Sequence, residues 1–192
     1  MDAIAILRNR AAAATASLVD TVRKLDGVDL VRPVAPGTSP LGLTLWHVPR
    51  AQDWLVQGSV RGVTEVAEDF QDGLPDPERY GFGTGLSREQ AEAAAAAVDP
   101  ERLVAYAVAV RDEVDAWLAQ LTEEDLDAVP PFAVRQASRA SYSTPEALLD
   151  VASLDGLTTG VLLLRPATTH VFRHLGEVDA LLAIARASQT SA

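Results

Sequence analysis

The stretch from Leu103 to Leu121 limits the possible folds more than any other part of this sequence. Its apolar residues follow one another at steps of four, three, four, three and four, and charged residues such as Arg111 and Asp115 fill the positions between them. Apolar residues at this spacing form a stripe along one face of an α-helix. The pattern therefore predicts a long helix that buries one face and exposes the other.

Two further long helices are predicted in the N-terminal third of the chain. Apolar residues at mostly helical intervals indicate a first helix over residues 2–25, which stops at Asp26-Gly27. Ser39-Pro40 then offers an N-cap followed by a proline at the first helical position. From there a second helix can run to about Gly58.

The last long helix ends the chain and covers residues 168–186. It starts either at Pro166 or earlier, near Leu157, with a kink at Pro166. Other signals mark shorter helices: start signals at Asp99-Pro100 and Thr144-Pro145, and a capping box, Ser87 to Gln90, that opens an alanine-rich helix to Val98.

Four long helices joined by irregular connections predict an all-α fold. No run alternates cleanly enough to predict a strand, and we expect an up-down four-helix bundle with short helices in the connections. No internal repeat and no linker divides the sequence, so residues 1–192 are expected to form a single domain. The longest irregular stretch, residues 71–85, is rich in glycine and proline, and long loops are often functional.

Composition excludes several classes of protein. There is no cysteine, which rules out disulfides and thiolate sites and makes a reducing cytoplasm the simplest expected compartment. The N-terminus lacks the basic region of a signal peptide, and no apolar run approaches the roughly 20 residues that a bilayer requires. The net charge is −11 and the basic residues are dispersed, so we expect neither a nucleic-acid partner nor a membrane partner.

All three histidines can be placed in one site. His170 and His174 are four residues apart on the last predicted helix, which brings their Cβ atoms to about 5–6 Å on one face. His47 lies in the second predicted helix. If the two helices pack side by side, three neutral imidazoles converge and leave coordination positions open, as in a catalytic metal site. The alternative is that the histidine pair arises by chance, since every helix contains many residue pairs four positions apart. His47 would then be an ordinary core or surface residue.

Three other charged residues are candidates for the same site. Glu177 follows His174 by three residues and shares its face, which suggests a carboxylate that orients a ligand or acts as a general base. Arg50 and Arg173 each follow a histidine by three residues. They either extend to solvent or bind an anionic substrate or the carboxylate of a thiol cofactor. Asp53, six residues after His47, points about 240° away on a regular helix and is a poor ligand unless the helix distorts at Pro49.

Some features carry little weight. Gly81-x-Gly83-x-Gly85 lacks the preceding strand and the lysine of a phosphate loop, so a flexible connector is expected there. Serines 141, 143 and 153 have no nucleophile elbow around them. The tryptophans at 46, 54 and 117 are expected in the core, although Trp46 beside His47 could line a pocket.

Two segments resemble a known family. Trp46-His47-Val-Pro-Arg50-Ala-Gln52-Asp53 resembles the first-histidine helix of the DinB-like proteins, especially their thiol-dependent branch, and the segment from His170 to Leu181 is similar to their closing helix. Gly81 to Gly85 also resembles a loop of this branch. Pro49 and Pro166 depart from the regular helices that the pattern requires.

The resemblance implies a four-helix bundle with a divalent metal, zinc or nickel, bound by His47, His170 and His174. The branch includes maleylpyruvate isomerase-like enzymes and transferases that use mycothiol, bacillithiol or glutathione, in which the metal activates the thiol. It thus implies a metal-dependent thiol transferase that acts on a small electrophile. The position of Glu177 suits it to orient a ligand or handle a proton in such a reaction. The alternatives are a non-catalytic bundle that binds a ligand or partner and a hydrolase that needs no thiol; a homodimer is plausible for any of them.

Overall fold

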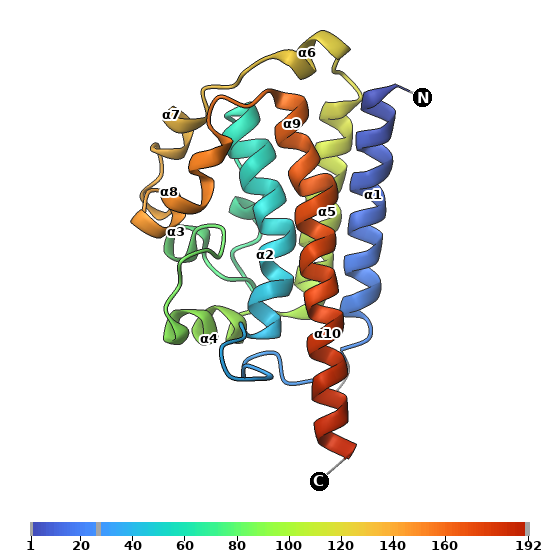
Figure 1. Cartoon of the computed structure of the whole chain (residues 1–192), viewed down its shortest axis with the longest axis vertical. Coiled ribbons are helices and arrows are strands. Elements are labelled where there is room, and N and C mark those ends of the chain that lie inside the picture. The colour runs from blue at the N-terminus through green and yellow to red at the C-terminus, as the bar shows by residue number, and fades with distance from the viewer. Residues whose placement is uncertain (1, 26–27, 191–192) are drawn as a thin grey trace.

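A computed structural model of the chain describes residues 2–25 and 28–190 (Figure 1). Within this part of the chain all regular secondary structure is helical, which confirms the all-α expectation. No helix in the same part is both long enough and apolar enough to cross a bilayer. The predicted helix stop at Asp26-Gly27 lies outside the described residues.

Four long helical segments lie side by side in Figure 1. Their bounds are Ala3–Val22 for α1, Leu41–Asp53 for α2 with its extension η1 at Trp54–Arg61, Pro100–Leu118 for α5, and Thr159–Leu164, Arg165–Thr169 and His170–Thr190 for the continuous run α9, η5 and α10. The segments η1 and η5 are π-helical. The last long helix therefore starts at the earlier of the two predicted places, and Pro166 lies within it.

The direction of these segments follows from the residues that meet between them. Asp53 contacts Tyr106, and further along both helical segments Arg61 contacts Glu113. The segment α2–η1 and α5 therefore run parallel. Figure 1 shows α1 and α10 running the opposite way, and α1 is tied to α5 through an ion pair between Arg8 and Asp115 of 2.7 Å. This order differs from the expected up-down order, because residues 62–99 carry the chain back along the molecule before α5 begins.

Short helices occupy the connections, as predicted. The stretch between η1 and α5 contains three of them, η2 at Val66–Asp69, α3 at Pro77–Tyr80 and α4 at Arg88–Ala96. The stretch between α5 and α9 contains α6 at Glu123–Asp127, α7 at Phe132–Gln136, η3 at Ala140–Tyr142, α8 at Pro145–Val151 and η4 at Ala152–Leu154. In Figure 1 α3, α4, α7 and α8 all lie on the side of α2 that faces away from α1.

Most of the predicted start signals are confirmed by their hydrogen bonds. The side chains of Asp99 and Thr144 cap α5 and α8, and Ser87 forms a complete capping box with Gln90 at the start of α4. The second helix begins one residue later than predicted, with Pro40 as its N-cap, and stays helical to Arg61.

The main hydrophobic core joins α1, α2, α5 and α10. Trp46 is buried in it, and Trp117 packs against it while partly exposed. A second apolar cluster lies between η1 and the helices that follow α6, where Trp54 stacks on Phe82 with ring centroids 4.1 Å apart. The two clusters hold α2 and η1 from both sides, which fixes the position of His47 between them.

Candidate metal centre

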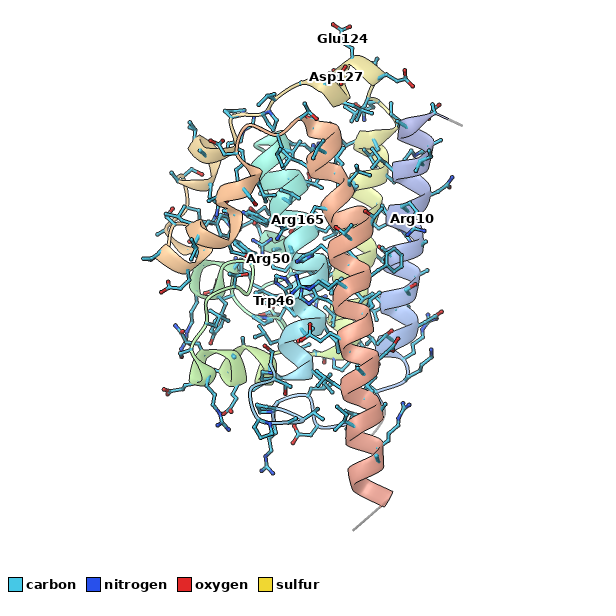
Figure 2. The ribbon with its side chains drawn as sticks, viewed as in Figure 1. Arg10, Trp46, Arg50, Glu124, Asp127 and Arg165 are labelled. Atoms are coloured by element: carbon cyan, nitrogen blue, oxygen red, sulfur yellow. The ribbon has the colours of Figure 1, made fainter. Side chains whose placement is uncertain are left out.

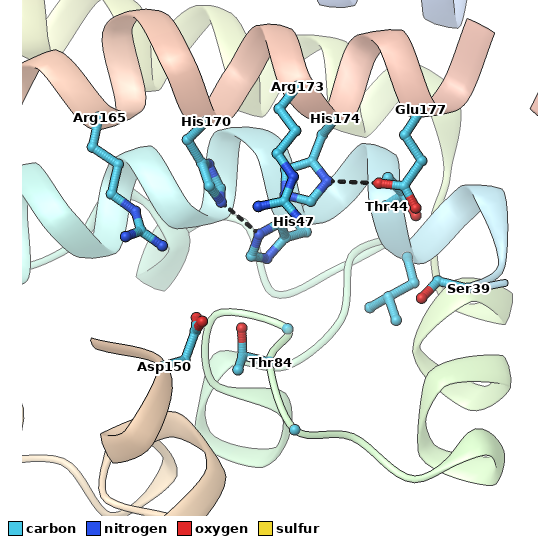
Figure 3. Close-up of a pocket in the computed structure, with 13 residues that line it drawn as sticks. Ser39, Thr44, His47, Thr84, Asp150, Arg165, His170, Arg173, His174 and Glu177 are labelled. Atoms are coloured by element: carbon cyan, nitrogen blue, oxygen red, sulfur yellow. Dashed lines mark hydrogen bonds and ion pairs between the residues drawn. The ribbon is translucent and has the colours of Figure 1, made fainter. Parts of the chain in front are cut away.

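The three histidines meet between α2 and α10. The ring centroids of His47 lie 4.9 Å from those of His170 and His174, and the latter two rings are 4.6 Å apart. One ring nitrogen from each residue falls within 4.8 Å of the others, and the Nε2 atoms of His47 and His170 are 3.1 Å apart. Figure 3 shows the three rings pointing toward one another. The predicted convergence of His47, His170 and His174, here called the triad, is thus present.

The ring of His47 is oriented by a backbone carbonyl. Its Nδ1 lies 2.5 Å from the oxygen of Phe82, and because a carbonyl only accepts hydrogen bonds, Nδ1 carries the proton and donates. In the neutral ring, Nε2 then keeps its lone pair, and Nε2 is the atom that faces the triad. A hydrogen bond of this kind on the far nitrogen is the usual way in which a protein fixes a metal-binding imidazole.

A carboxylate orients His174 in the same manner. Nδ1 of His174 is 3.0 Å from Oε2 of Glu177, one turn further along α10. The sequence places these two residues on one face, and Figure 3 shows the contact. The Nε2 atom of His174 is left without a proton for a ligand in the cavity.

Burial keeps two of the three rings, those of His47 and His170, uncharged. It lowers the pKa of His47 to about 4, and the neighbouring His174 adds to the effect. It lowers the pKa of His170 to about 2, with the neighbouring histidines adding to the effect. Both rings are therefore neutral at pH 7, which is the form that binds a metal.

This donor set fits a divalent metal ion. Two nitrogens bound to one zinc ion at about 2.0–2.1 Å each can be no more than about 4.2 Å apart. The 3.1 Å between His47 and His170 satisfies that limit, and the full set, within 4.8 Å, lies close to it. Imidazole nitrogens suit zinc, nickel, copper and iron. Three such ligands leave room for a further ligand, which is the arrangement of catalytic rather than structural sites.

Both helices of the triad are distorted beside a proline. Pro49 lies inside α2, whose continuation η1 is π-helical. Pro166 lies in η5, the π-helical segment that ends directly before His170. Proline has no N–H for the helical ladder, and π-helical turns are frequent at functional sites. The pair His170 and His174 itself lies in regular α-helix, so the i, i+4 spacing is retained.

The triad opens into a cavity of about 240 Å³. Besides the histidines, its walls include Arg165, Arg173 and Glu177 from the last long helix, and Asp150 and Thr84 from the facing connections (Figure 3). The sequence indicated Glu177 and Arg173 as site residues. It gave no sign of Arg165, which on a regular helix would point about 140° away from His170. The wider turns of η5 bring it to the cavity.

Arg50 does not line the cavity and does not reach solvent. Its side chain is completely buried in a cluster with Asp53, Glu65, Tyr106 and Tyr142, here called the Arg50 cluster (Figure 2). The expected extension to solvent is therefore wrong. The sequence could not reveal this, because the acidic partner Glu65 and the phenol of Tyr142 come from other segments.

Asp53 belongs to the Arg50 cluster and not to the triad. It accepts hydrogen bonds from the backbone N–H groups of Val66 and Ala67 at 3.0 and 2.9 Å and from the hydroxyl of Tyr106 at 2.8 Å. Burial raises the pKa of Asp53, and the charge of Arg50 opposes that rise. The Asp53 side chain thus holds the start of η2 against α2.

The Arg50 cluster also supports the triad indirectly. Nε of Arg50 donates to the carbonyl of Gly81 at 3.1 Å, and the next carbonyl, that of Phe82, accepts the proton of His47. Gly83 follows with a left-handed φ of 88°, and a Cβ there would lie 3.2 Å from Nδ1 of His47. The glycine-rich stretch is therefore an anchored loop that backs the first ligand, not only a connector.

The comparisons with known proteins agree with this geometry. The family model of the DinB superfamily matches residues 9–178, a range that contains all three histidines and most of the helical core. A comparison with curated proteins finds no match. Since the family match covers well over half of the sequence, the chain belongs to the DinB superfamily.

Proposed function

We propose that this protein is a metal-dependent thiol transferase, with zinc or nickel bound by His47, His170 and His174. The observation that carries the proposal is the convergence of the triad, with the outer nitrogens of His47 and His174 already bonded to Phe82 and Glu177. The remaining ring nitrogens of the triad then face one another, as they would around a shared ion.

A divalent ion held there would lower the pKa of a bound thiol or water, so that a nucleophile is available at neutral pH. The protein's own side chains and backbone would position the ligands and the second reactant. Phe82 and Glu177 hold the rings in position, and the arginines and hydroxyls of the cavity hold the second reactant. A volume of about 240 Å³ suits a small electrophile. The choice of thiol, mycothiol or a related compound, rests on the resemblance of the two histidine segments to the thiol-dependent branch.

The metal site is tested by elemental analysis of protein purified without a histidine tag. We expect one equivalent of zinc or nickel per chain, and its loss in a His170→Ala variant. Since a protein with a net charge of −11 can collect cations on its surface, a Glu124→Gln variant in the exposed helix α6 is the control and should keep the full equivalent (Figure 2). Equal metal content in the wild type and in His170→Ala would refute the proposal.

The reaction is tested by conjugation of monochlorobimane with mycothiol. Turnover by the wild type, its absence in His170→Ala and its persistence in Glu124→Gln would support the transferase. A metal-loaded protein without thiol-dependent turnover would favour one of the two alternatives, a hydrolase that uses water or a bundle that binds without catalysis.

A further inference from the structure

Two arginines face the triad without a carboxylate partner. Arg165 and Arg173 both line the cavity, and Figure 3 shows their side chains extending from the last long helix on the side of the histidines. In residues 2–25 and 28–190, neither forms an ion pair, whereas Arg8, Arg50 and Arg139 all do. Arginines left unpaired beside a cavity are available for a ligand.

The acidic groups of the cavity leave these charges free. Glu177 is engaged by His174, and Asp150 lies across the opening on α8, where Figure 3 shows it on the opposite wall. Two arginines and two carboxylates therefore line the cavity, and the arginines lie on the wall opposite Asp150.

An apolar groove adjoins the same two arginines. It has a volume of about 370 Å³ and is lined by Leu154, Leu157, Val161 and Leu164. It shares Arg165, His170 and Arg173 with the triad cavity, so the two spaces meet beside the triad. The side of α9 that borders it is unusually exposed for apolar residues, with Val161 at 48% and Leu164 at 47%.

We infer that the second reactant is an organic acid with an apolar body. Its carboxylate binds Arg165 and Arg173, and its apolar part lies in the groove along α9, next to the triad. Arginine suits this role because its planar group offers two parallel donors to a carboxylate. The inference rests on the proposed function for what happens to the acid, but its binding does not require the metal.

The test is calorimetric titration with 4-phenylbutyrate and with the uncharged 4-phenylbutanamide. Because a zinc ion would itself attract carboxylates, the deciding titration uses protein freed of metal by chelation. We expect the acid to bind at least about tenfold more tightly than the amide, the usual scale for charge-assisted hydrogen bonds. Arg165→Gln and Arg173→Gln should each remove most of this preference.

Two further variants separate charge from apolar contact. Arg32→Gln removes the same charge at a position whose side chain is 88% exposed and outside both cavities, and it should leave the preference unchanged. Leu164→Ser should weaken the acid and the amide by the same factor. Since Leu164 is half exposed, this change does not threaten the fold, which circular dichroism can verify.

The inference fails if acid and amide bind equally to the wild type, or if the preference survives in both arginine variants. Its failure is distinguishable from that of the proposed function. A protein that prefers the acid but never holds metal would refute only the proposed function. A protein that holds metal in the triad but shows no preference would refute only the inference.

Discussion

The triad and the Arg50 cluster lie one turn apart on the same helix, yet their chemistry is opposite. The cluster is charged and buried, and its carboxylates accept hydrogen bonds from several parts of the chain. The triad borders a cavity, and one nitrogen of each of its rings faces the other two. Both clusters are polar and both depend on α2, but among the described residues only the triad gathers ligand atoms that could hold a metal ion.

This difference separates structural from functional residues within one sequence motif. His47, Arg50 and Asp53 all belong to the segment that resembles the family. Arg50 and Asp53 bind other parts of the protein and hold the loops that surround the site, whereas His47 is itself held by such a loop. One motif can therefore combine a residue of a candidate metal site with residues that are architectural.

The largest expected effect is on stability, in an Arg50→Ala variant. Removing this side chain leaves Asp53 buried without its cation and Glu65 paired with Arg139 alone, and breaking a buried ion pair in this way typically costs about 3–5 kcal/mol. Urea unfolding of metal-free protein measures the change. His170→Ala, measured in the same way, should change the free energy of unfolding by less than about 1 kcal/mol. If His170→Ala were the more destabilising of the two, the division between the two clusters would be wrong.

Next in size is the effect of Glu177→Gln on metal affinity. Loss of the carboxylate that orients His174 should weaken zinc binding about 10–100-fold, as for other groups that orient metal ligands. Competition with a chromogenic chelator measures the affinity. Asp179→Asn removes the same charge two residues along α10 at an exposed position and serves as the control. Equal affinities for both variants would show that Glu177 does not position His174.

A smaller effect is expected at the loop that backs His47. Gly83→Ala and Gly156→Ala both place a side chain at a left-handed φ, 88° and 76°, and each should lose about 1 kcal/mol of stability. Only at Gly83 would the new Cβ press on His47, since nothing lies within 4 Å of the corresponding position at Gly156. Metal affinity should fall in Gly83→Ala alone, and an equal fall in both would argue against this contact.

The pH dependence of the metal-free protein gives a further test of the triad. The pKa of His47 is about 4 when folded and about 6.5 when unfolded, so below pH 6.5 only the unfolded chain takes up this proton. The free energy of unfolding should therefore decrease as the pH falls from 7 to 5. Urea unfolding at several pH values measures it, and His47→Gln should show a shallower decrease. Identical slopes would mean that His47 is not buried as a neutral ring.

Local signals in the sequence predicted most of the helices correctly. The apolar steps of residues 103–121 mark α5, and the caps at Ser87, Asp99 and Thr144 act as predicted, because these effects depend on neighbours within one or two turns. The predicted up-down order of the four long helices was wrong, because the direction of α5 depends on the path of residues 62–99. No local pattern specifies that path.

The same distinction holds for the site. Spacing alone placed His170, His174 and Glu177 on one face, since a helix repeats every 3.6 residues. That His47 meets them, that Arg165 turns into the cavity through η5, and that Arg50 is buried against Glu65 and Tyr142 were decided only by tertiary packing. The physical reason is range: periodicity and capping act between residues close in sequence, whereas the burial and partner of a side chain depend on segments that folding brings together.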